Sequence, residues 1–466
     1  MCLQDYNVLR SILLTVYRHQ YYENGNWPQW FMFDRYYSIQ HHESHGDIIV
    51  WPLKALSDYI RASGDFGILE QELVYTHLEG YEFTGHRETL MQHVRRQIAY
   101  ILEHFIPGTH LSCYGDGDWD DTLQPFDPSM RKSMASGWTV SLTYQVFREF
   151  GELLAAYDPE LSGSLSGMAA EIKKDYHRHM IKDGVTSGFI HFDGDDMKYL
   201  LHPKDEATGL KYRLLPMTRS CISGMFDPQE AASHYDLIKE HLYHPDGVRL
   251  MDRTCTYRGG INTYFKRAET AANFGREIGL QYVHAHIRYV ESMAKLGKAG
   301  ETWDNLLKVI PINIRAHVPN ASVRQSNCYF SSSDAEFDNR YEAMAGFDRL
   351  REGKVPVKAG WRIYSSGPGI LMNQLISNVL GLRLEKDTVI LDPVLPEKLD
   401  GLVFHYKIHG IPVKIIYDVK GSGPVQAVSV NGETIPFTAQ EQPYRFGGAR
   451  FHISHLTDSC TIKILR

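Results

Sequence analysis

The stretch RETLMQHVRRQIAYILEHF (residues 87–105) shows the pattern that decides the fold class of this chain. Its apolar residues recur every three or four positions, at Leu90, Val94, Ile98, Ile101, Leu102 and Phe105. This spacing places them on one face of an α-helix. Pro107 and Gly108 then end the helix. The stretch therefore predicts an amphipathic helix with one face turned towards a core.

Similar helical patterns lie on both sides of this stretch. They are IIVWPLKALSDYIRASGD (residues 48–65), GWTVSLTYQVFREFGELLAAY (residues 137–157) and EIGLQYVHAHIRYVESMAKLG (residues 277–297), the last ending in Gly297 as a C-cap. The connections between them are long, and long loops are often functional. For residues 1–380 we expect a mainly α domain of the (α/α)6 toroid type, in which helical hairpins surround a central pocket.

The period of the pattern changes after Gly381. In DGLVFHYKIHGIPVKIIYDVKG (residues 400–421) apolar residues alternate with polar ones on both sides of a turn at 409–411, as in two paired strands. Asn431-Gly432 lies between two further strand-like runs and is a strong hairpin signal. Residues 381–466 therefore predict a small antiparallel, jelly-roll-like β-domain.

Composition limits the classes of function. The chain has 466 residues, of which 43% are hydrophobic and 23% charged, with a net charge of −7 and a pI near 6.4. The absence of a basic run argues against nucleic acid and anionic membranes as partners. The six cysteines form no CxxC pair, which argues against zinc and a disulfide framework, and the first residues resemble neither a signal peptide nor a membrane span. We expect a cytoplasmic protein with free thiols.

The loop SCYGDGDWDDTLQP (residues 112–125) concentrates four aspartates and one tryptophan. A solvated turn is one interpretation, because Gly and Asp favour turns. A calcium loop is a second, but the bidentate glutamate near the twelfth position of an EF-hand is missing. A sugar subsite is the third, since an indole can lie against a pyranose ring while carboxylates accept hydrogen bonds from hydroxyls or protonate a glycosidic oxygen.

The run Asp118-Trp119-Asp120-Asp121 resembles the D-W-N-D signature of glycoside hydrolase family 94, the inverting glycoside phosphorylases. Its D-W-D-D-T-L-Q form is most similar to the branch that acts on β-1,2-linked oligoglucans. Other segments resemble family motifs in the same order: HGDIIVWPLKALSDYIRASGDFGILEQELVY (residues 45–75), SGWTVSLTYQ (136–145), GREIGLQYVHA (275–285), IYSSGPGI (363–370) and LDPVLPEKLDG (391–401). Together they cover most of the chain.

The resemblance assigns roles to these positions. It implies that Asp121 is the catalytic acid. The substrate-binding residues would be Asp47, Asp118, Trp119, Arg276 and Glu277, with Arg276 in place of the family's lysine. The phosphate-binding residues would be His284, Ser365 and Ser366, with Ser366 in place of a glycine. The implied co-substrate is inorganic phosphate, with neither a cofactor nor a metal.

Three hypotheses for the function stay open. In an inverting phosphorylase, one acid protonates the leaving oxygen while phosphate attacks the anomeric carbon. An inverting hydrolase would need a second carboxylate as base, for which Asp47 and Glu277 are candidates. The third hypothesis is a catalytically incomplete sugar-binding or assembly module. Family members begin with a β-sandwich, which we expect to be absent from this chain, so we also expect a homodimer or association with the missing N-terminal region.

Overall fold

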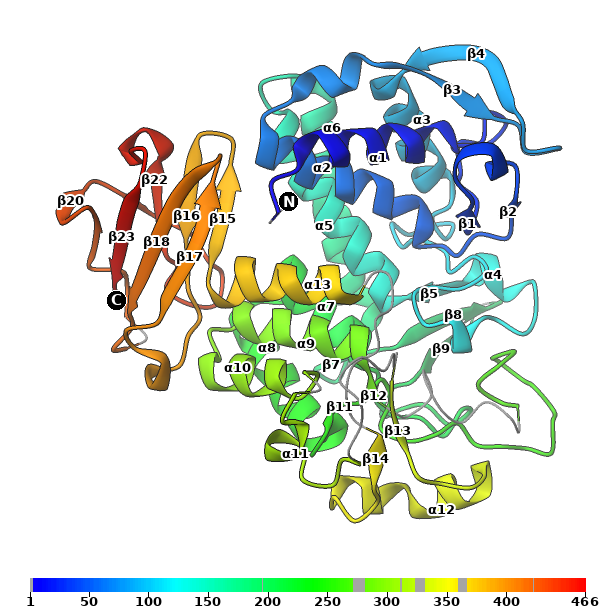
Figure 1. Ribbon diagram of the computed structural model, residues 1–466. Coiled ribbons are helices and arrows are strands. Elements are labelled where there is room, and N and C mark those ends of the chain that lie inside the picture. Colours follow the sequence, from blue (N-terminus) through cyan, green and yellow to red (C-terminus); the bar gives the residue numbers. More distant parts are fainter. Residues whose placement is uncertain are drawn as a thin grey trace.

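The computed structural model describes residues 3–194, 196–270, 281–310, 312–322, 332–358, 367–421 and 423–466 (Figure 1). The α-helices are α1 (Tyr6–Arg18), α2 (Trp51–Ser63), α3 (Leu90–Glu103), α4 (Met130–Ser133), α5 (Gly137–Leu154), α6 (Pro159–Asp175), α7 (Leu214–Ser223), α8 (Pro228–Leu237), α9 (Val283–Lys295), α10 (Ala299–Leu307), α11 (Ile314–His317), α12 (Arg340–Arg351) and α13 (Gly367–Asn373).

Strands lie between the helices and also make up the C-terminal part. The strands among the helices are β1 (Trp30–Phe31), β2 (Gln40–His41), β3 (Glu72–Thr76), β4 (Phe83–Thr89), β5 (Met134–Ser136), β6 (Ile181–Lys182), β7 (Val185–Thr186), β8 (Phe189–Asp193), β9 (Asp196–Leu200), β10 (Tyr243–His244), β11 (Gly247–Val248), β12 (Gln281–Tyr282), β13 (Ser332–Ala335) and β14 (Val357–Lys358). The C-terminal strands are β15 (Leu382–Glu385), β16 (Thr388–Leu391), β17 (Val403–Ile408), β18 (Ile411–Asp418), β19 (Ala427–Val430), β20 (Glu433–Ile435), β21 (Thr438–Ala439), β22 (Ala449–His452) and β23 (Cys460–Leu465).

The predicted helices are present, each within its expected stretch, and α9 shows the largest change of boundary. Helix α3 begins after Thr89, whose side chain forms a capping box with Gln92, and its apolar stripe is buried from Leu90 to Ile101. Helix α9 begins only at Val283, although the helical pattern starts at residue 277. The preceding residues of β12 pair with β13 instead, and residues 277–280 lie outside the described parts of the chain. Strand pairing therefore shortens this helix.

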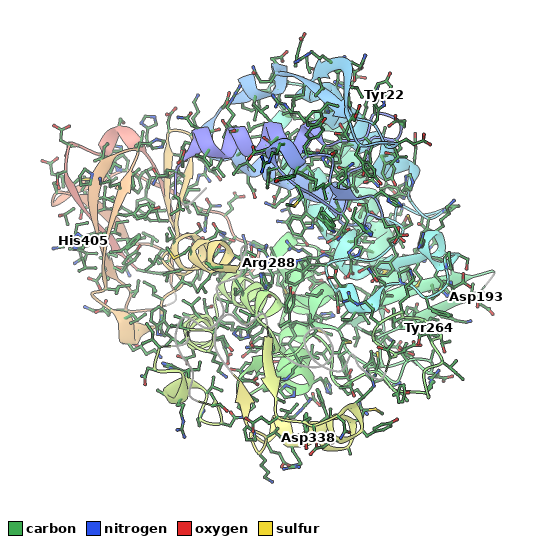
Figure 2. The ribbon with its side chains drawn as sticks, turned by 45° about the vertical axis from the view of Figure 1, so that its right-hand side comes forward. Tyr22, Asp193, Tyr264, Arg288, Asp338 and His405 are labelled. Atoms are coloured by element: carbon green, nitrogen blue, oxygen red, sulfur yellow. The ribbon has the colours of Figure 1, made fainter. Side chains whose placement is uncertain are left out.

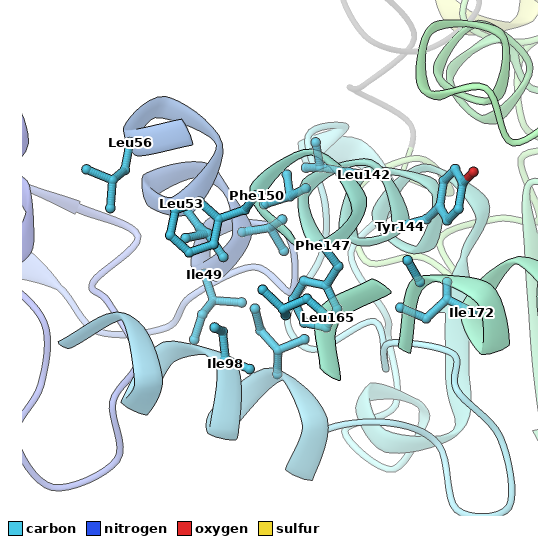
Figure 3. Packing of buried hydrophobic residues seen from close by; sticks show 14 of the residues in the cluster. Ile49, Leu53, Leu56, Ile98, Leu142, Tyr144, Phe147, Phe150, Leu165 and Ile172 are labelled. Carbon is cyan, nitrogen blue, oxygen red and sulfur yellow. The ribbon is translucent and has the colours of Figure 1, made fainter. Parts of the chain in front are cut away.

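One large hydrophobic core joins the N-terminal helices. Leu53 from α2, Ile98 from α3 and Phe147 from α5 meet in it, and α6 contributes Leu165 and Ile172 (Figure 3). These side chains are almost completely buried. Complete burial of an aliphatic or phenylalanine side chain contributes about 1.5–3 kcal/mol. The core therefore fixes how α2, α3, α5 and α6 lie against one another.

The helices alternate between an inner and an outer layer. Helices α2, α5, α7, α9 and α13 pack against one another in that order, while α1, α6, α8 and α10 lie against α2, α5, α7 and α9 from outside. All residues of α7 are buried, as expected for an inner helix. This is the order of an α/α toroid, and the mainly α fold class with a C-terminal β-region is confirmed. Within the described residues, we find no helix both long and apolar enough to cross a bilayer.

Two sheets form the C-terminal region at one end of the molecule (Figure 1). Their strand orders are β15-β16-β22-β21 and β17-β18-β23-β19-β20. The turn between β17 and β18 and the Asn431-Gly432 hairpin between β19 and β20 occur where the sequence predicts them. Asn431 and Gly432 both have positive φ, as a tight two-residue hairpin turn requires. One pairing differs from the antiparallel expectation, because β23 lies parallel to β18.

A cavity of about 1130 Å³ lies between the inner helices and the C-terminal sheets. Charged side chains contribute to its lining, among them Lys54, Glu149, Arg219 and Arg288. Figure 2 shows Arg288 beside this opening, far from His405 on the sheets. Asp47, Asp118, Trp119, Asp121 and His284 do not line this cavity. These five predicted site residues therefore lie elsewhere on the helical part.

Candidate active site

Two loops interlock to form the candidate site. The turn at His45 to Asp47 lies against the aspartate loop: the Gly46 amide donates to the Gly117 carbonyl over 2.8 Å, and His45 forms a β-bridge with Gly115. A Cβ at Gly46 would lie 2.5 Å from the Tyr114 carbonyl oxygen. Glycine therefore allows the two loops to approach closely.

Asp118 anchors the aspartate loop inside the protein. The Asp118 carboxylate is completely buried. Its Oδ1 and Oδ2 both accept hydrogen bonds from Arg213 Nη2, over 2.9 and 3.0 Å. The Ser136 hydroxyl also donates to this carboxylate, as does the Asp120 amide. A buried carboxylate needs such partners, because an unpaired charge in the interior is strongly unfavourable. The ion pair therefore determines where the rest of the loop lies.

Asp120 and Asp116 also stabilise the loop. Asp120 caps a short 3₁₀-helix, Asp121–Leu123, by accepting hydrogen bonds from the Thr122 amide and hydroxyl. Asp116 pairs with Arg131 over 2.7 Å. The loop's acidic composition thus serves mainly to bind its own backbone and nearby arginines.

The indole of Trp119 joins two predicted site residues. It stacks on Trp138, with ring centroids 5.3 Å apart and an interplanar angle of 16°. On another side it meets the His284 imidazole edge to face, with centroids 6.1 Å apart. Tyr282 lies 5.5 Å away, also measured between centroids. The predicted sugar platform is therefore next to the predicted phosphate ligand.

Asp47 is buried below this aromatic group. Its Oδ2 accepts hydrogen bonds from the indole Nε1 atoms of Trp51 and Trp138, each over 3.1 Å. Burial, followed by the negative charge of Asp118, raises the pKa of Asp47 from 3.8 to about 6. The neighbouring His45 and the two indole hydrogen bonds act in the opposite direction and lower it. Asp47 thus contacts both tryptophans by hydrogen bonds, and its pKa responds to the charge of Asp118 in the aspartate loop.

His284 lies in the first turn of α9 and is almost completely buried. Burial, reinforced by Arg288, lowers its pKa to about 4. The imidazole is therefore neutral at neutral pH and can donate one N–H to a ligand oxygen. His286, on the same helix, contacts the Asn305 carbonyl and accepts from the Val248 amide, which agrees with its interpretation as a core histidine.

Asp121 is the accessible carboxylate of the loop. Its side chain is 45% exposed. Its Oδ1 lies 3.7 Å from His45 Nδ1 and its Oδ2 lies 3.9 Å from Arg267 Nη1, which also donates to the Asp121 carbonyl. Because the other three aspartates of the loop are engaged in pairs or caps, Asp121 is the one placed to meet a ligand.

Four of the expected site residues lie outside the described parts of the chain: Arg276, Glu277, Ser365 and Ser366. Conversely, the sequence pattern did not indicate Arg213, Arg267 or the specific contacts of Trp138 and His45. The motif segments SGW and HGD contain Trp138 and His45, so a signal was present for these two. Arg213 is 95 positions from its partner Asp118, and nothing in the sequence pattern relates them.

The site and the scaffold can be compared with known proteins. Residues 34–335 match the catalytic domain of the glycosyl hydrolase 94 superfamily, and residues 381–460 match the glycoside phosphorylase C-terminal domain. The chain therefore belongs to the glycosyl hydrolase 94 superfamily, and the family resemblance found in the sequence is confirmed.

Among individual relatives, the 1,2-β-oligoglucan phosphorylase of Listeria innocua is 49% identical over 456 residues, which cover 97% of this chain and 41% of that protein. The cyclic β-(1,2)-glucan synthase of Rhizobium meliloti is 22% identical, over 83% of this chain and 13% of that protein. The chain thus spans less than half the length of either relative.

Solved structures give a more distant similarity. A family 78 rhamnosidase of Bacillus sp. GL1 has a TM-score of 0.46 at 12% identity, covering 81% of this chain and 33% of the rhamnosidase. A cellobiose 2-epimerase from Bacillus thermoamylovorans has a TM-score of 0.34 at 11% identity, covering 78% of this chain and 97% of the epimerase.

Proposed function

We propose that the chain carries the catalytic site of an inverting glycoside phosphorylase. It transfers a glucosyl unit from a β-1,2-linked oligoglucan to inorganic phosphate and releases α-glucose 1-phosphate. The observation that carries this proposal is the contact between the Trp119 indole and the His284 imidazole, because it brings a sugar platform and a phosphate ligand together. The 49% identity to the Listeria phosphorylase supports the linkage.

The proposed reaction has a single acid. Asp121 gives its proton to the glycosidic oxygen, the bond from that oxygen to the anomeric carbon breaks, and a phosphate oxygen attacks the same carbon from the opposite face. Configuration inverts from β to α. Because phosphate is itself the nucleophile, the protein needs no general base. The exposed position of Asp121 suits a proton donor that must reach a substrate atom.

The remaining residues bind and orient. The face of Trp119 that is not stacked on Trp138 packs against the glucosyl ring, and neutral His284 donates to phosphate. Asp47 acts by accepting from the indoles of Trp51 and Trp138, and Asp118 acts by holding the loop through Arg213. Arg276 and Glu277 add contacts to the sugar, and Ser365 and Ser366 add contacts to phosphate, on the motif resemblance alone.

The environment of Asp47 disfavours this residue as the base of a hydrolase. A hydrolytic base must hold a water opposite the acid. Asp47 is 1% exposed, and its Oδ2 already accepts from two indoles. A carboxylate so enclosed is poorly placed to activate water, which argues against Asp47 as a hydrolytic base; the other candidate, Glu277, lies outside the described residues.

The test is glucose 1-phosphate release from sophorooligosaccharides with and without phosphate, by wild type, Asp121→Asn and Asp116→Asn. We expect product only with phosphate, a loss of at least about 1,000-fold in Asp121→Asn, and near wild-type rates in Asp116→Asn, whose carboxylate pairs with Arg131. Free glucose formed without phosphate would show a hydrolase. Sugar binding without either product would show an incomplete module.

A further inference from the structure

We propose that His45 is a positioning residue for the catalytic acid: its Nδ1–H donates to Asp121 Oδ1 and leaves Oδ2 to carry the transferred proton. This inference rests on the proposed function of Asp121. His45 belongs to neither the D-W-D-D run nor the phosphate motifs, and the chain folds it against the acid from 76 positions away.

The tautomer of His45 follows from its other nitrogen. Gln124 Nε2 lies 3.0 Å from His45 Nε2. An amide nitrogen only donates, so His45 Nε2 must accept. A neutral imidazole that accepts at Nε2 carries its proton on Nδ1, the atom that faces Asp121 Oδ1. Gln124 therefore selects the tautomer that can donate to the acid.

The imidazole is held firmly. Its side chain is 6% exposed, and the His45 amide donates to Gln29 Oε1 over 2.8 Å. One ring edge lies directly on Gly117, where a Cβ would stand 3.1 Å from both Cδ2 and Nε2. The backbone of the aspartate loop thus packs against the ring, and the ring has little freedom to turn away from Asp121.

The separation of 3.7 Å between Nδ1 and Oδ1 exceeds a hydrogen bond. Asp121 is half exposed and can move, whereas His45 is fixed. Catalytic hydrogen bonds are commonly long without substrate and tighten in the reacting complex. A small rotation of the Asp121 side chain brings its Oδ1 within range of the Nδ1–H.

This contact strengthens as the reaction proceeds. When Asp121 releases its proton to the leaving oxygen, negative charge develops on the carboxylate, and a donor to Oδ1 stabilises that charge. In the synthetic direction the same bond holds the carboxylate ready to accept a proton from the attacking hydroxyl. Two other charged groups act here: Asp47, whose charge interacts with His45, and the exposed Arg267 beside Oδ2.

Two substitutions separate donation from packing. In His45→Asn the amide nitrogen falls near the position of Nδ1 and keeps the donor. In His45→Gln the amide reaches the position of Nε2, which keeps the Gln124 contact but removes the donor to Asp121. We expect kcat of His45→Asn within about threefold of wild type and kcat of His45→Gln lower by about 100-fold, with little change in either KM.

The pH profile provides a second measurement. An acid must be protonated to act, so kcat falls at high pH as Asp121 ionises. Without the His45 donor the ionised carboxylate loses stabilisation, so this limb moves to higher pH in His45→Gln but not in His45→Asn. Melting temperatures of both variants show that each folds.

The outcomes distinguish the positioning role of His45 from the catalytic role of Asp121. Equal kcat values for the two variants, or an unmoved high-pH limb in a folded His45→Gln, would overturn the role of His45 and leave Asp121 as the acid. Full activity of Asp121→Asn would instead refute the proposed function itself. Impairment of His45→Gln alone, with the shifted limb, supports the positioning role.

Discussion

Trp119 lies face to face with Trp138, at 5.3 Å between ring centroids, and Trp138 in turn donates its indole N–H to Asp47. One face of the Trp119 indole is therefore fixed by a buried tryptophan on α5. The platform that Trp119 offers to a sugar is rigid because its support belongs to the core.

Replacing Trp119 by alanine should weaken substrate binding. Burial of a large apolar side chain against a ligand contributes about 1.5–3 kcal/mol, so we expect kcat/KM for the oligosaccharide to fall by about 10- to 100-fold. Trp119→Phe keeps a flat apolar face and should lose less than tenfold. Steady-state kinetics on both variants measures this, and equal losses in the two would show that the ring face is not used.

The sequence predicts local periodic structure well, and the particular elements show why. The stripe of α3 is decided by neighbours within four positions, and the hairpin at Asn431-Gly432 by two residues. The predicted start of α9 was wrong because Gln281 and Tyr282 pair with β13, about fifty residues away. The alternation of apolar and polar residues in β23 likewise predicts a strand. It does not predict that this strand pairs in parallel with β18.

For the site, the motif residues could be predicted but their surroundings could not. Asp118 was expected beside the sugar, yet its oxygens are engaged with Arg213 and Ser136. The contact of Trp119 with His284 joins positions 165 residues apart and follows from the packing of α9 against the loop. Such pairings depend on tertiary structure, which no local pattern contains.

Asp118→Asn should destabilise the protein strongly, because it leaves the buried Arg213 guanidinium without its counter-charge. Removing one partner of a buried ion pair costs about 3–5 kcal/mol. Denaturant unfolding of Asp118→Asn, Arg213→Met and the double variant measures the interaction free energy between the two side chains. We expect the double variant to lose at least about 1 kcal/mol less than the sum of the single losses; additive losses would contradict a direct coupling.

Asp47 should make stability fall as pH rises. Its pKa is raised from 3.8 to about 6 in the folded protein, so the folded state holds a proton that the unfolded state has released between these values. At about 1.4 kcal/mol for each pH unit, the free energy of unfolding should drop by on the order of 3 kcal/mol between about pH 4 and pH 7 through this group.

Asp47→Asn removes that proton equilibrium. The difference in unfolding free energy between wild type and this variant should therefore change by a similar amount over the same pH range, in the variant's favour at pH 7. Asp236→Asn, on the exposed side of α8, is the matched control and should run parallel to wild type. If the difference in unfolding free energy between wild type and Asp47→Asn did not vary with pH, the result would argue against a raised pKa of Asp47 in the folded protein.

His284→Ala should raise the KM for phosphate more than the KM for the oligosaccharide. A hydrogen bond to a charged group contributes about 1.5–3 kcal/mol, so the expected rise is about 10- to 100-fold, against less than about twofold for the sugar. His286→Ala on the same helix is the control. It removes buried bonds to Asn305 and Val248 and should lower the melting temperature while leaving the KM for phosphate unchanged.

Gly46→Ala should disrupt the contact between the two active-site loops. A Cβ there would lie 2.5 Å from the Tyr114 carbonyl oxygen and 2.9 Å from that of Cys113, and these backbone atoms cannot move aside as a flexible side chain would. We expect a loss of about 1–3 kcal/mol in stability and a larger fractional loss in kcat, because His45 and Asp47 shift relative to Asp121.

Gly85→Ala on β4 is the matched control for Gly46→Ala, since among the described residues no atom lies within 4 Å of its added Cβ. It should leave both kcat and melting temperature near wild type, and the entropy lost by the unfolded chain favours a slight stabilisation. If Gly46→Ala kept wild-type kcat while its melting temperature fell, the loops would have to keep their catalytic spacing by contacts other than the one between Gly46 and Tyr114. The pair of glycine variants thus tests whether the close backbone approach at Gly46, rather than the ion pair of Asp118, holds Asp121 in place beside His45.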